Sequence, residues 1–190
     1  MLGLADVSFS EIDPALQECL TEYYKVDDMH NYDQLVRALG YFTHKYGKLD
    51  RLDSQNEYWL ETEARLRTDF NIKGIKSIGI EKIKRKSEMK RIFKEAGLNP
   101  ARGRVCLNAS EVKKFVDEVG YPVVAKPDNG VGAAKTYKLE NEKQIEHFLS
   151  DKLPVEYILE EFINEPIVTF DGLVDDDGEL VFSSSLRYSK

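Results

Sequence analysis

The sequence predicts an α/β fold in the first half of the chain and an α+β arrangement in the second half. In the first half, short strand-like runs alternate with stretches of helical periodicity, which is typical of an α/β layer. In the last part, strand-like runs follow one another and are separated by turn residues. With 190 residues, 42% hydrophobic and 32% charged, the chain suffices for one large or two small globular domains.

The first 74 residues predict strands and helices in alternation. The expected elements are a strand at 23–26, a helix at 33–46, a strand at 49–52 and a helix at 57–70. Asn31 or Asp33 is expected to cap the first helix, and Gly47 is expected to end it. This alternation predicts a small open α/β layer.

Three further helices are predicted in the middle of the chain. Residues 85–96 form the first, which Gly97 closes, and its apolar residues Met89, Ile92 and Phe93 are expected to point inward.

Capping-box patterns start the other two helices. Asn108 is followed three residues later by Glu111, and in the same way Asn141 is followed by Gln144. The first of this pair is expected to end at Gly120.

The remaining elements are predicted to be strands. They are expected at 105–107, 123–125, 135–139, 157–159, 167–170 and 179–182. Asp175-Asp-Asp-Gly178 predicts a hairpin turn, because it lacks the glycine and glutamate spacing of a calcium-binding EF-hand loop. The sequence stops soon after the last strand without a closing helix, so we expect this sheet to continue in a longer protein.

The most informative stretch joins a strand lysine to a glycine-bearing loop. The apolar run at 123–125 is expected to form a strand that ends near Lys126, and Gly130 and Gly132 follow in the next loop. A strand holds the lysine charge still, and glycines let backbone N–H groups approach phosphate oxygens closely. The stretch indicates a phosphate site, although it is neither a Walker lysine motif nor a dinucleotide fingerprint. Taken alone, the two glycines are more typical of an ordinary hairpin.

Composition argues against several classes of protein. The net charge of −7 argues against a nucleic-acid partner. The two cysteines, Cys19 and Cys106, show no pairing pattern, and the three histidines show no metal-ligand spacing. No apolar run approaches the ~20 residues that span a bilayer, and the N-terminal residues do not read as a signal peptide. We therefore expect a cytoplasmic protein without a membrane or nucleic-acid partner.

Three motifs that bear lysine or glutamate occur in order along the chain. They are Lys86-Ser-Glu-Met89-Lys-x-x-Phe-x-x-x-Gly97, Tyr121-Pro-Val-Val-Ala-Lys126-Pro and Leu159-Glu160-Glu161-Phe162-Ile163. Their order and spacing resemble the ATP-grasp superfamily, near carbamoyl-phosphate synthase large subunits and biotin carboxylase. The resemblance runs over most of the chain. It implies a Rossmann-like pre-ATP-grasp domain at 1–74, a first ATP-grasp subdomain at 75–153, and the start of an incomplete second subdomain at 154–190.

The resemblance also implies an ATP site. Its residues would be Lys86, Lys126, Asn129, Gly130, Gly132, Ala133, Ala134, Glu160, Glu161, Ile163 and Glu165. The two lysines would contact the α- and β-phosphates, and the loop would close on the β- and γ-phosphates. The Glu160 carboxylate would accept from the adenine amino group, while the backbones of Glu161 and Ile163 would read the ring edge. Glu165 would take the ribose hydroxyls, although Asn164-Glu165-Pro166 departs from the Gly-x-Glu of the family.

The resemblance implies Mg²⁺ as well, but the chain offers no ligands for it. Members of the superfamily hold magnesium with an acidic residue and a Glu-x-Asn pair that lie well beyond the position of Glu160. No equivalent occurs in residues 171–190, so no metal ligand and no catalytic residue is assigned. These residues alone are not expected to form a competent ligase.

Three functions are consistent with these motifs. The leading hypothesis is the ATP-binding part of a carbon–nitrogen ligase that activates a carboxylate as an acyl-phosphate for attack by an amine or ammonia. The alternative is a non-catalytic nucleotide-binding module, or one half of a split enzyme that needs a complementing chain. Separately, the open edge of the last sheet offers a surface through which two copies can pair as a homodimer. A third is a flavodoxin-like binding protein with one sheet through the whole chain. Glu57, Arg65 and Arg67 are either substrate-side residues or, for the arginines, ion-pairing residues on a helix.

Overall fold

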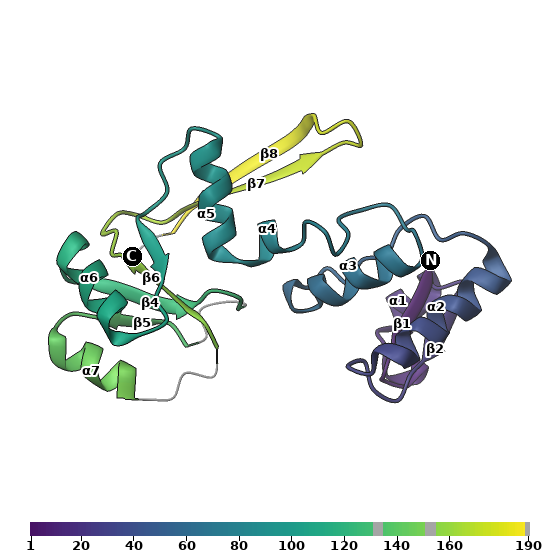
Figure 1. The fold of residues 1–190 in the computed structure, drawn as a ribbon. Coiled ribbons are helices and arrows are strands. Elements are labelled where there is room, and N and C mark those ends of the chain that lie inside the picture. The colour runs from purple at the N-terminus through teal and green to yellow at the C-terminus, as the bar shows by residue number, and fades with distance from the viewer. Residues whose placement is uncertain (131–134, 151–154, 189–190) are drawn as a thin grey trace. The chain divides into compact units, whose positions relative to one another are not determined.

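The computed structural model is a mixed α/β protein, and it describes residues 1–130, 135–150 and 155–188 (Figure 1). The chain forms two compact units. Unit 1 contains Met1–Leu98 together with the described residues of Asp128–Ala134. Unit 2 contains the described residues of Asn99–Pro127 and Lys135–Lys190.

Unit 1 contains a two-stranded parallel sheet and a set of helices. The elements are β1 (Leu2–Ala5), a 3-10 turn (Phe9–Glu11), α1 (Pro14–Cys19), β2 (Glu22–Lys25), α2 (Tyr32–Tyr46), a second 3-10 turn (Glu57–Trp59), α3 (Leu60–Asp69), α4 (Glu81–Lys84) and α5 (Lys86–Glu95). Parallel strands need a crossover connection, and here the first 3-10 turn and α1 make it. The predicted strand at 23–26 and the predicted helix at 33–46 are confirmed within one residue at each end.

The helix α2 is defined by its caps and by its apolar face. The Asn31 side chain accepts from the Gln34 backbone N–H at 3.3 Å, so Asn31 rather than Asp33 is the N-cap. Gly47 ends the helix with a φ of 84°, a left-handed conformation that favours glycine. The buried face packs into a core formed by Val26, Leu35, Ala38, Leu39, Leu66 and Ile72.

Two expectations for unit 1 are wrong. Residues 49–52 form no strand, because the Leu52 carbonyl accepts from the Arg67 guanidinium at 2.9 Å (Nε) and 2.5 Å (Nη2) instead of pairing with a neighbouring strand. Met89, Ile92 and Phe93 do not point into a core, and α5 has no buried residue. They line an open apolar groove that is described below. The predicted helix at 57–70 is present as the second 3-10 turn followed by α3.

Unit 2 is built on a four-stranded sheet with the order β3-β6-β4-β5. The elements are β3 (Gly103–Val105), α6 (Ala109–Val119), β4 (Val123–Pro127), β5 (Tyr137–Leu139), α7 (Glu142–Ser150), β6 (Tyr157–Glu161), β7 (Val168–Val174) and β8 (Leu180–Arg187). Each neighbouring pair of strands in the sheet is antiparallel. The helices α6 and α7 cover one face of it (Figure 1). Their apolar residues pack with the sheet in a core formed by Val112, Phe115, Val116, Val123, Ala125, Leu139, Ile145, Phe148, Tyr157 and Leu159.

The predicted N-caps of unit 2 are confirmed, but the reciprocal bond of each box comes from the residue before the cap. The Leu107 N–H donates to Glu111 at 2.8 Å, and the Glu140 N–H donates to Gln144 at 2.7 Å. The Asn108 side chain accepts from the Glu111 backbone N–H at 3.0 Å, and the Asn141 side chain accepts from Gln144 at 3.1 Å. Gly120 ends α6 as predicted, with a φ of 81°. These caps satisfy backbone donors that the first turn of a helix leaves without a partner.

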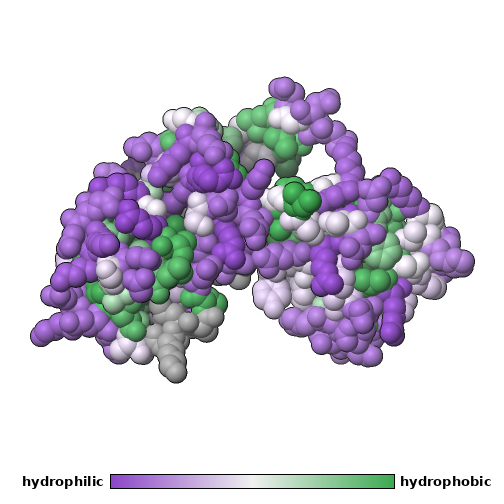
Figure 2. Space-filling model, in the orientation of Figure 1, coloured by the Kyte–Doolittle hydropathy of each residue, from purple (hydrophilic) through white to green (hydrophobic). Residues whose placement is uncertain are grey.

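The last two strands form a separate hairpin. β7 and β8 pair antiparallel from Val168 opposite Arg187 to Val174 opposite Leu180, with a bulge near the turn. The Asp175–Gly178 turn is confirmed, because the Gly178 N–H donates to the Asp175 carbonyl at 3.2 Å. Nearly every residue of the hairpin is exposed, and green apolar surface lies over it in Figure 2.

The described strands belong to three sheets rather than one. The flavodoxin-like alternative, which expected a single sheet through the whole chain, is therefore wrong. No described helix combines the length and the apolar character that crossing a bilayer requires.

Candidate functional site

The candidate site in unit 2 lies on two adjacent strands of the four-stranded sheet. Lys126 on β4 pairs with Ile158 on β6, and Glu160 lies two residues further along β6. The diagonal neighbour in an antiparallel pair lies on the same face of the sheet, so the two charged side chains meet. The Lys126 Nζ is 2.5 Å from the Glu160 Oε2. Two residues predicted from separate motifs are thus direct partners.

The sheet pattern explains why this ion pair stands where it does. Val123 and Ala125 lie on the same face of β4, and both are fully buried in the core beneath α6 and α7. Lys126 directly follows Ala125 along the strand. Because side chains alternate between the faces of a strand, Lys126 must point to the opposite face. Its side chain is 28% exposed and that of Glu160 is 10% exposed, so the pair is only partly open to water. A lysine in this position can exchange its carboxylate partner for the phosphate of a ligand.

In unit 1, Lys86 contacts the start of the glycine-bearing loop. The Lys86 Nζ donates to the Gly130 carbonyl at 3.0 Å, and its backbone N–H donates to the Asp128 carbonyl at 3.1 Å. Arg85 and Asn129 form an isolated antiparallel bridge beside these contacts. The first predicted lysine therefore lies directly against the predicted loop.

Sequence analysis missed Asp128, which organises this part of unit 1. Its side chain is fully buried and accepts from the Ser87 N–H and from the Ser87 hydroxyl, each at 2.8 Å. Arg85 Nη1 adds a contact at 3.4 Å. A carboxylate at a helix N-terminus is favourable because the first N–H groups of the helix point at it. The available signal was an acidic residue directly after Lys126-Pro127, together with the lack of a capping side chain at Arg85.

The remaining loop residues are only partly described. The Asn129 side chain donates to the Glu61 carboxylate at 2.9 Å, so it is engaged within unit 1. Gly130 is half-buried. Gly132, Ala133 and Ala134, which the sequence assigns to the phosphate loop, lie outside the described residues.

The other predicted residues of unit 2 follow Glu160 along the chain. The Glu161 carboxylate accepts from the Arg102 backbone N–H at 2.7 Å and from the Arg102 guanidinium at 2.6 Å. The Glu161 N–H in turn donates to the Arg102 carbonyl at 3.0 Å. Ile163 and Glu165 are exposed in the connection between β6 and β7. Their expected contacts with adenine and ribose stay predictions.

The substrate-side candidates of unit 1 have structural partners. Arg67 forms an ion pair with Glu63 at 2.8 Å, and both side chains are buried, which confirms the helical ion-pair interpretation. The Arg65 guanidinium lies 3.5 Å from the centre of the Tyr32 ring. The Glu57 carbonyl accepts from Lys84 at 2.8 Å.

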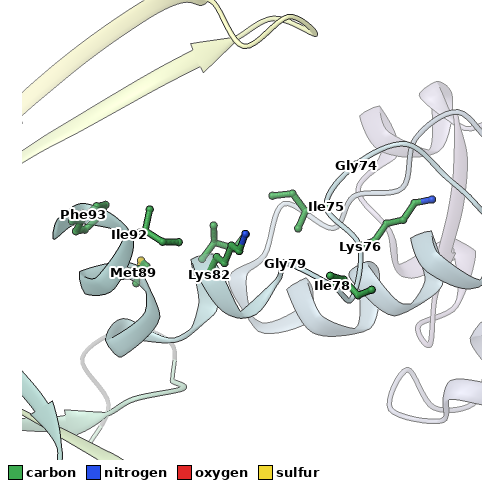
Figure 3. A pocket seen from close by; sticks show the side chains of 10 residues that line it. Gly74, Ile75, Lys76, Ile78, Gly79, Lys82, Met89, Ile92 and Phe93 are labelled. Carbon is green, nitrogen blue, oxygen red and sulfur yellow. The ribbon is translucent and has the colours of Figure 1, made fainter. Parts of the chain in front are cut away.

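An open apolar groove of 810 Å³ runs along the second half of unit 1. Figure 3 shows Met89, Ile92 and Phe93 on α5 and Lys82 on α4 among its lining residues. Such a lining offers little to a polyphosphate, since it is mostly hydrocarbon. The groove is therefore distinct in chemistry from the lysine sites.

Within the described ranges, no three histidine, cysteine, aspartate or glutamate side chains gather into a metal-binding group. Both cysteines are free thiols, and burial raises the pKa of Cys106 to about 11.

Comparison with known proteins identifies similar sequences and folds. No protein-family model matches the chain. The carbamoyl phosphate synthase large chain of Pasteurella multocida (strain Pm70) is 23% identical over 140 residues, which cover 69% of this chain. The chain spans only 13% of the length of that relative.

Solved structures match the whole chain. The N5-carboxyaminoimidazole synthetase from Staphylococcus aureus complexed with ADP aligns over 100% of this chain with a TM-score of 0.75 and 17% identity. The L-amino acid ligase from Bacillus licheniformis also aligns over 100%, with a TM-score of 0.70 and 15% identity. This chain covers 48% and 51% of those two chains, respectively, so it corresponds to about half of each fold.

Proposed function

Because the chain belongs to the ATP-grasp superfamily, we propose that it is the ATP-binding part of a ligase that joins carbon to nitrogen. The reaction would resemble that of carbamoyl phosphate synthase, since the similar sequences carry that name. The direct contact between Lys126 and Glu160 carries the proposal. It supports a nucleotide site because it brings together, on one face of a sheet, a cation for phosphate and an acceptor for the adenine amino group.

In this proposal, Lys126 leaves Glu160 when ATP binds and contacts the α- or β-phosphate. Lys86 provides a second cation, and the loop 130–134 closes on the β- and γ-phosphates. Glu160 then accepts from the adenine amino group, Glu161 and Ile163 line the ring edge, and Glu165 takes the ribose. Two lysines around one polyphosphate offset the negative charge that would otherwise repel a carboxylate nucleophile.

The chemistry follows from the superfamily. A carboxylate oxygen attacks the γ-phosphorus, the bond from this phosphorus to the bridging oxygen breaks, and ADP leaves. The resulting acyl-phosphate is attacked at carbon by an amine or ammonia, which loses a proton as phosphate departs. Magnesium would offset negative charge on the polyphosphate of such a site, and we assign it no ligand among the described residues.

Titration of the chain with ATP tests the nucleotide site. Isothermal titration of the wild-type chain and of Lys126→Met should show that the variant loses affinity by tenfold or more, about the value of one charge-assisted contact. Lys113→Met is the matched control, because Lys113 is exposed on α6 and its loss changes the net charge equally. Equal ATP affinity in all three proteins would contradict the proposal.

Glu160→Ala tests the adenine contact separately. The variant should lose the preference for ATP over GTP, because a carboxylate accepts from the amino group of adenine but repels the carbonyl oxygen of guanine. An unchanged preference for ATP over GTP would show that Glu160 does not contact the adenine. Lys126→Met is expected to weaken both nucleotides alike.

The second candidate is a non-catalytic nucleotide-binding module or one half of a split enzyme. It needs only the nucleotide contacts proposed for Lys126 and Glu160, which lie together in unit 2. In this version, residues 1–74 are a Rossmann-like domain that precedes the subdomains at 75–153 and 154–190, and a complementing chain supplies the rest. Hydroxylamine, which traps acyl-phosphates as hydroxamates, separates the two. Product from the chain with ATP and a carboxylate supports the ligase, whereas ATP binding without product supports the module.

A further inference from the structure

A lysine buried in unit 1 lacks a carboxylate partner among the described residues. Lys84 ends the short helix α4 and is only 5% exposed. Its ammonium donates to the Glu57 carbonyl at 2.8 Å, and no ion pair of Lys84 occurs in the described parts of the chain. An ammonium carries three donors and a full charge, and buried charges are normally paired. The neutral carbonyl satisfies one donor and leaves the charge uncompensated.

Lys84 also lines a pocket, and this pocket is distinct from the apolar groove of Figure 3. The pocket has a volume of 390 Å³, within the range of about 300–1,000 Å³ that is usual for small-molecule sites. Its lining comprises His30, Tyr58, Trp59, Glu61, Thr62, Lys84, Asn129 and Gly130, all of which belong to unit 1.

The pocket combines this cation with an aromatic wall. The Tyr58 and Trp59 rings meet edge to face with their centres 4.9 Å apart, and the His30 ring lies 5.1 Å from Trp59. His30 is held by its ring nitrogens, which lie 3.1 Å from Asp28 and 3.1 Å from the Tyr58 hydroxyl. Packed aromatic faces accept hydrocarbon or another ring.

Glu61 is the anionic side chain in this lining, and no ion pair joins it to Lys84 in the described parts of the chain. Its carboxylate accepts from the Asn129 side chain at 2.9 Å. Thr62 adds a hydroxyl to the lining, and Gly130 adds backbone. The lining thus places the buried ammonium of Lys84, which has no ion-pair partner among the described residues, beside the aromatic rings.

We propose that this pocket binds a small organic carboxylate with an apolar or aromatic body, whose carboxylate pairs with Lys84 and whose body packs on Tyr58 and Trp59. The inference rests on the proposed function, because such a ligand is the carboxylate that the ligase would phosphorylate. Gly130 lines the pocket and is also the first residue of the predicted phosphate loop. The pocket thus gives the carboxylate substrate a place that the nucleotide residues do not provide.

The test uses 3-phenylpropanoate and its neutral amide, 3-phenylpropanamide, which share a body and differ in charge. Trp59 is the only tryptophan of the chain, so its fluorescence reports binding in the pocket wall. At about pH 8, where histidine side chains are ordinarily neutral, the acid should change this fluorescence saturably and bind about tenfold tighter than the amide. Equal affinities for acid and amide in the wild-type chain would overturn the proposal.

Variants then assign the charge to one lysine. Lys84→Met should lower the affinity for 3-phenylpropanoate at least about tenfold and leave that for the amide unchanged, whereas Lys84→Arg should keep most of the preference. Lys82→Met is the control, because Lys82 is exposed on the same helix and does not line this pocket. An unchanged acid preference in a folded Lys84→Met protein would overturn the assignment. If that variant does not fold, the wild-type comparison of acid and amide still decides.

The failure of this inference can be told apart from failure of the proposed function. A chain that binds ATP but shows no preference for the acid keeps the nucleotide site and loses the carboxylate pocket. A chain that prefers the acid but binds no ATP keeps the pocket and loses the proposed function.

Discussion

Asp128 accepts two hydrogen bonds from Ser87, one from its backbone N–H and one from its hydroxyl, each at 2.8 Å. The two residues lie 41 positions apart in the sequence. The helix α5 has no capping side chain of its own at Arg85, and Asp128 takes that role from a distant segment. Because Lys86 and Gly130 are next to these residues, this cap holds the first predicted lysine and the start of the loop together.

Asp128→Ala should lower the free energy of unfolding by about 2 kcal/mol, since it removes a helix cap and charge-assisted hydrogen bonds. Ser87→Ala should cost about half of that, because the backbone donor of residue 87 keeps its acceptor. Asp117→Ala, an exposed position on α6, is the control and should stay within about 0.5 kcal/mol of the wild type. Urea denaturation measures all three, and equal values for the two aspartate variants would contradict the capping role.

Arg67→Met should cost more, about 3 kcal/mol, because it leaves the Glu63 carboxylate buried without its cation. The same change removes the donors to the Leu52 carbonyl. Arg65→Met is the matched variant on the same helix and should cost about 1 kcal/mol, the usual value of a cation–ring contact. Thermal and urea unfolding of the two proteins decide, and a milder effect at position 67 than at position 65 would disprove the structural role.

Glu22 should make stability depend on pH in the acid range. Hydrogen bonds from Lys45, Tyr41 and Tyr46 lower the pKa of Glu22 to about 2. A folded-state pKa below the unfolded value of about 4.3 means that the stabilisation is complete above about pH 5 and is lost as the pH falls toward 2. Wild type and Glu22→Gln should therefore differ in free energy of unfolding near pH 7 and converge near pH 2. A difference that stays constant over this range would rule out the carboxylate as the source.

Backbone amides of the β7–β8 hairpin should exchange with deuterium far faster than those of β4 and β6. A two-stranded hairpin without buried residues has little to hold it closed, whereas β4 and β6 lie in the core of unit 2. Phe170, for example, is 68% exposed, and Val123 is fully buried. Exchange followed by mass spectrometry should show at least about a hundredfold difference in rate. Similar protection in the two regions would mean that the hairpin packs against something in solution.

Sequence reasoning succeeded where the determining contacts are local. The caps at Asn108 and Asn141 reach residues three positions away, so the pattern of letters contains both partners. The glycine stops at Gly47 and Gly120 depend on the backbone conformation of a single residue. These signals gave α2, α6 and α7 close to their observed bounds, whereas the short helices α1 and α4 were not predicted.

Sequence reasoning failed where partners lie far apart. The 49–52 strand was wrong because the Leu52 carbonyl is taken by a guanidinium 15 residues away. Asp128 was missed because its donors lie 41 to 43 positions earlier in the chain. In both cases the local sequence around the residue does not indicate which distant side chain or backbone group bonds to it.

The sequence by itself determined the ordered lysine and glutamate motifs, the caps and the alternation of strands and helices, because each depends on residue type at short spacing. Only the tertiary structure decided that Lys126 contacts Glu160, that Asp128 caps α5 and that Lys84 is buried in the wall of a pocket. Those relationships depend on sheet register and on burial, and both arise only when segments far apart in the sequence pack together.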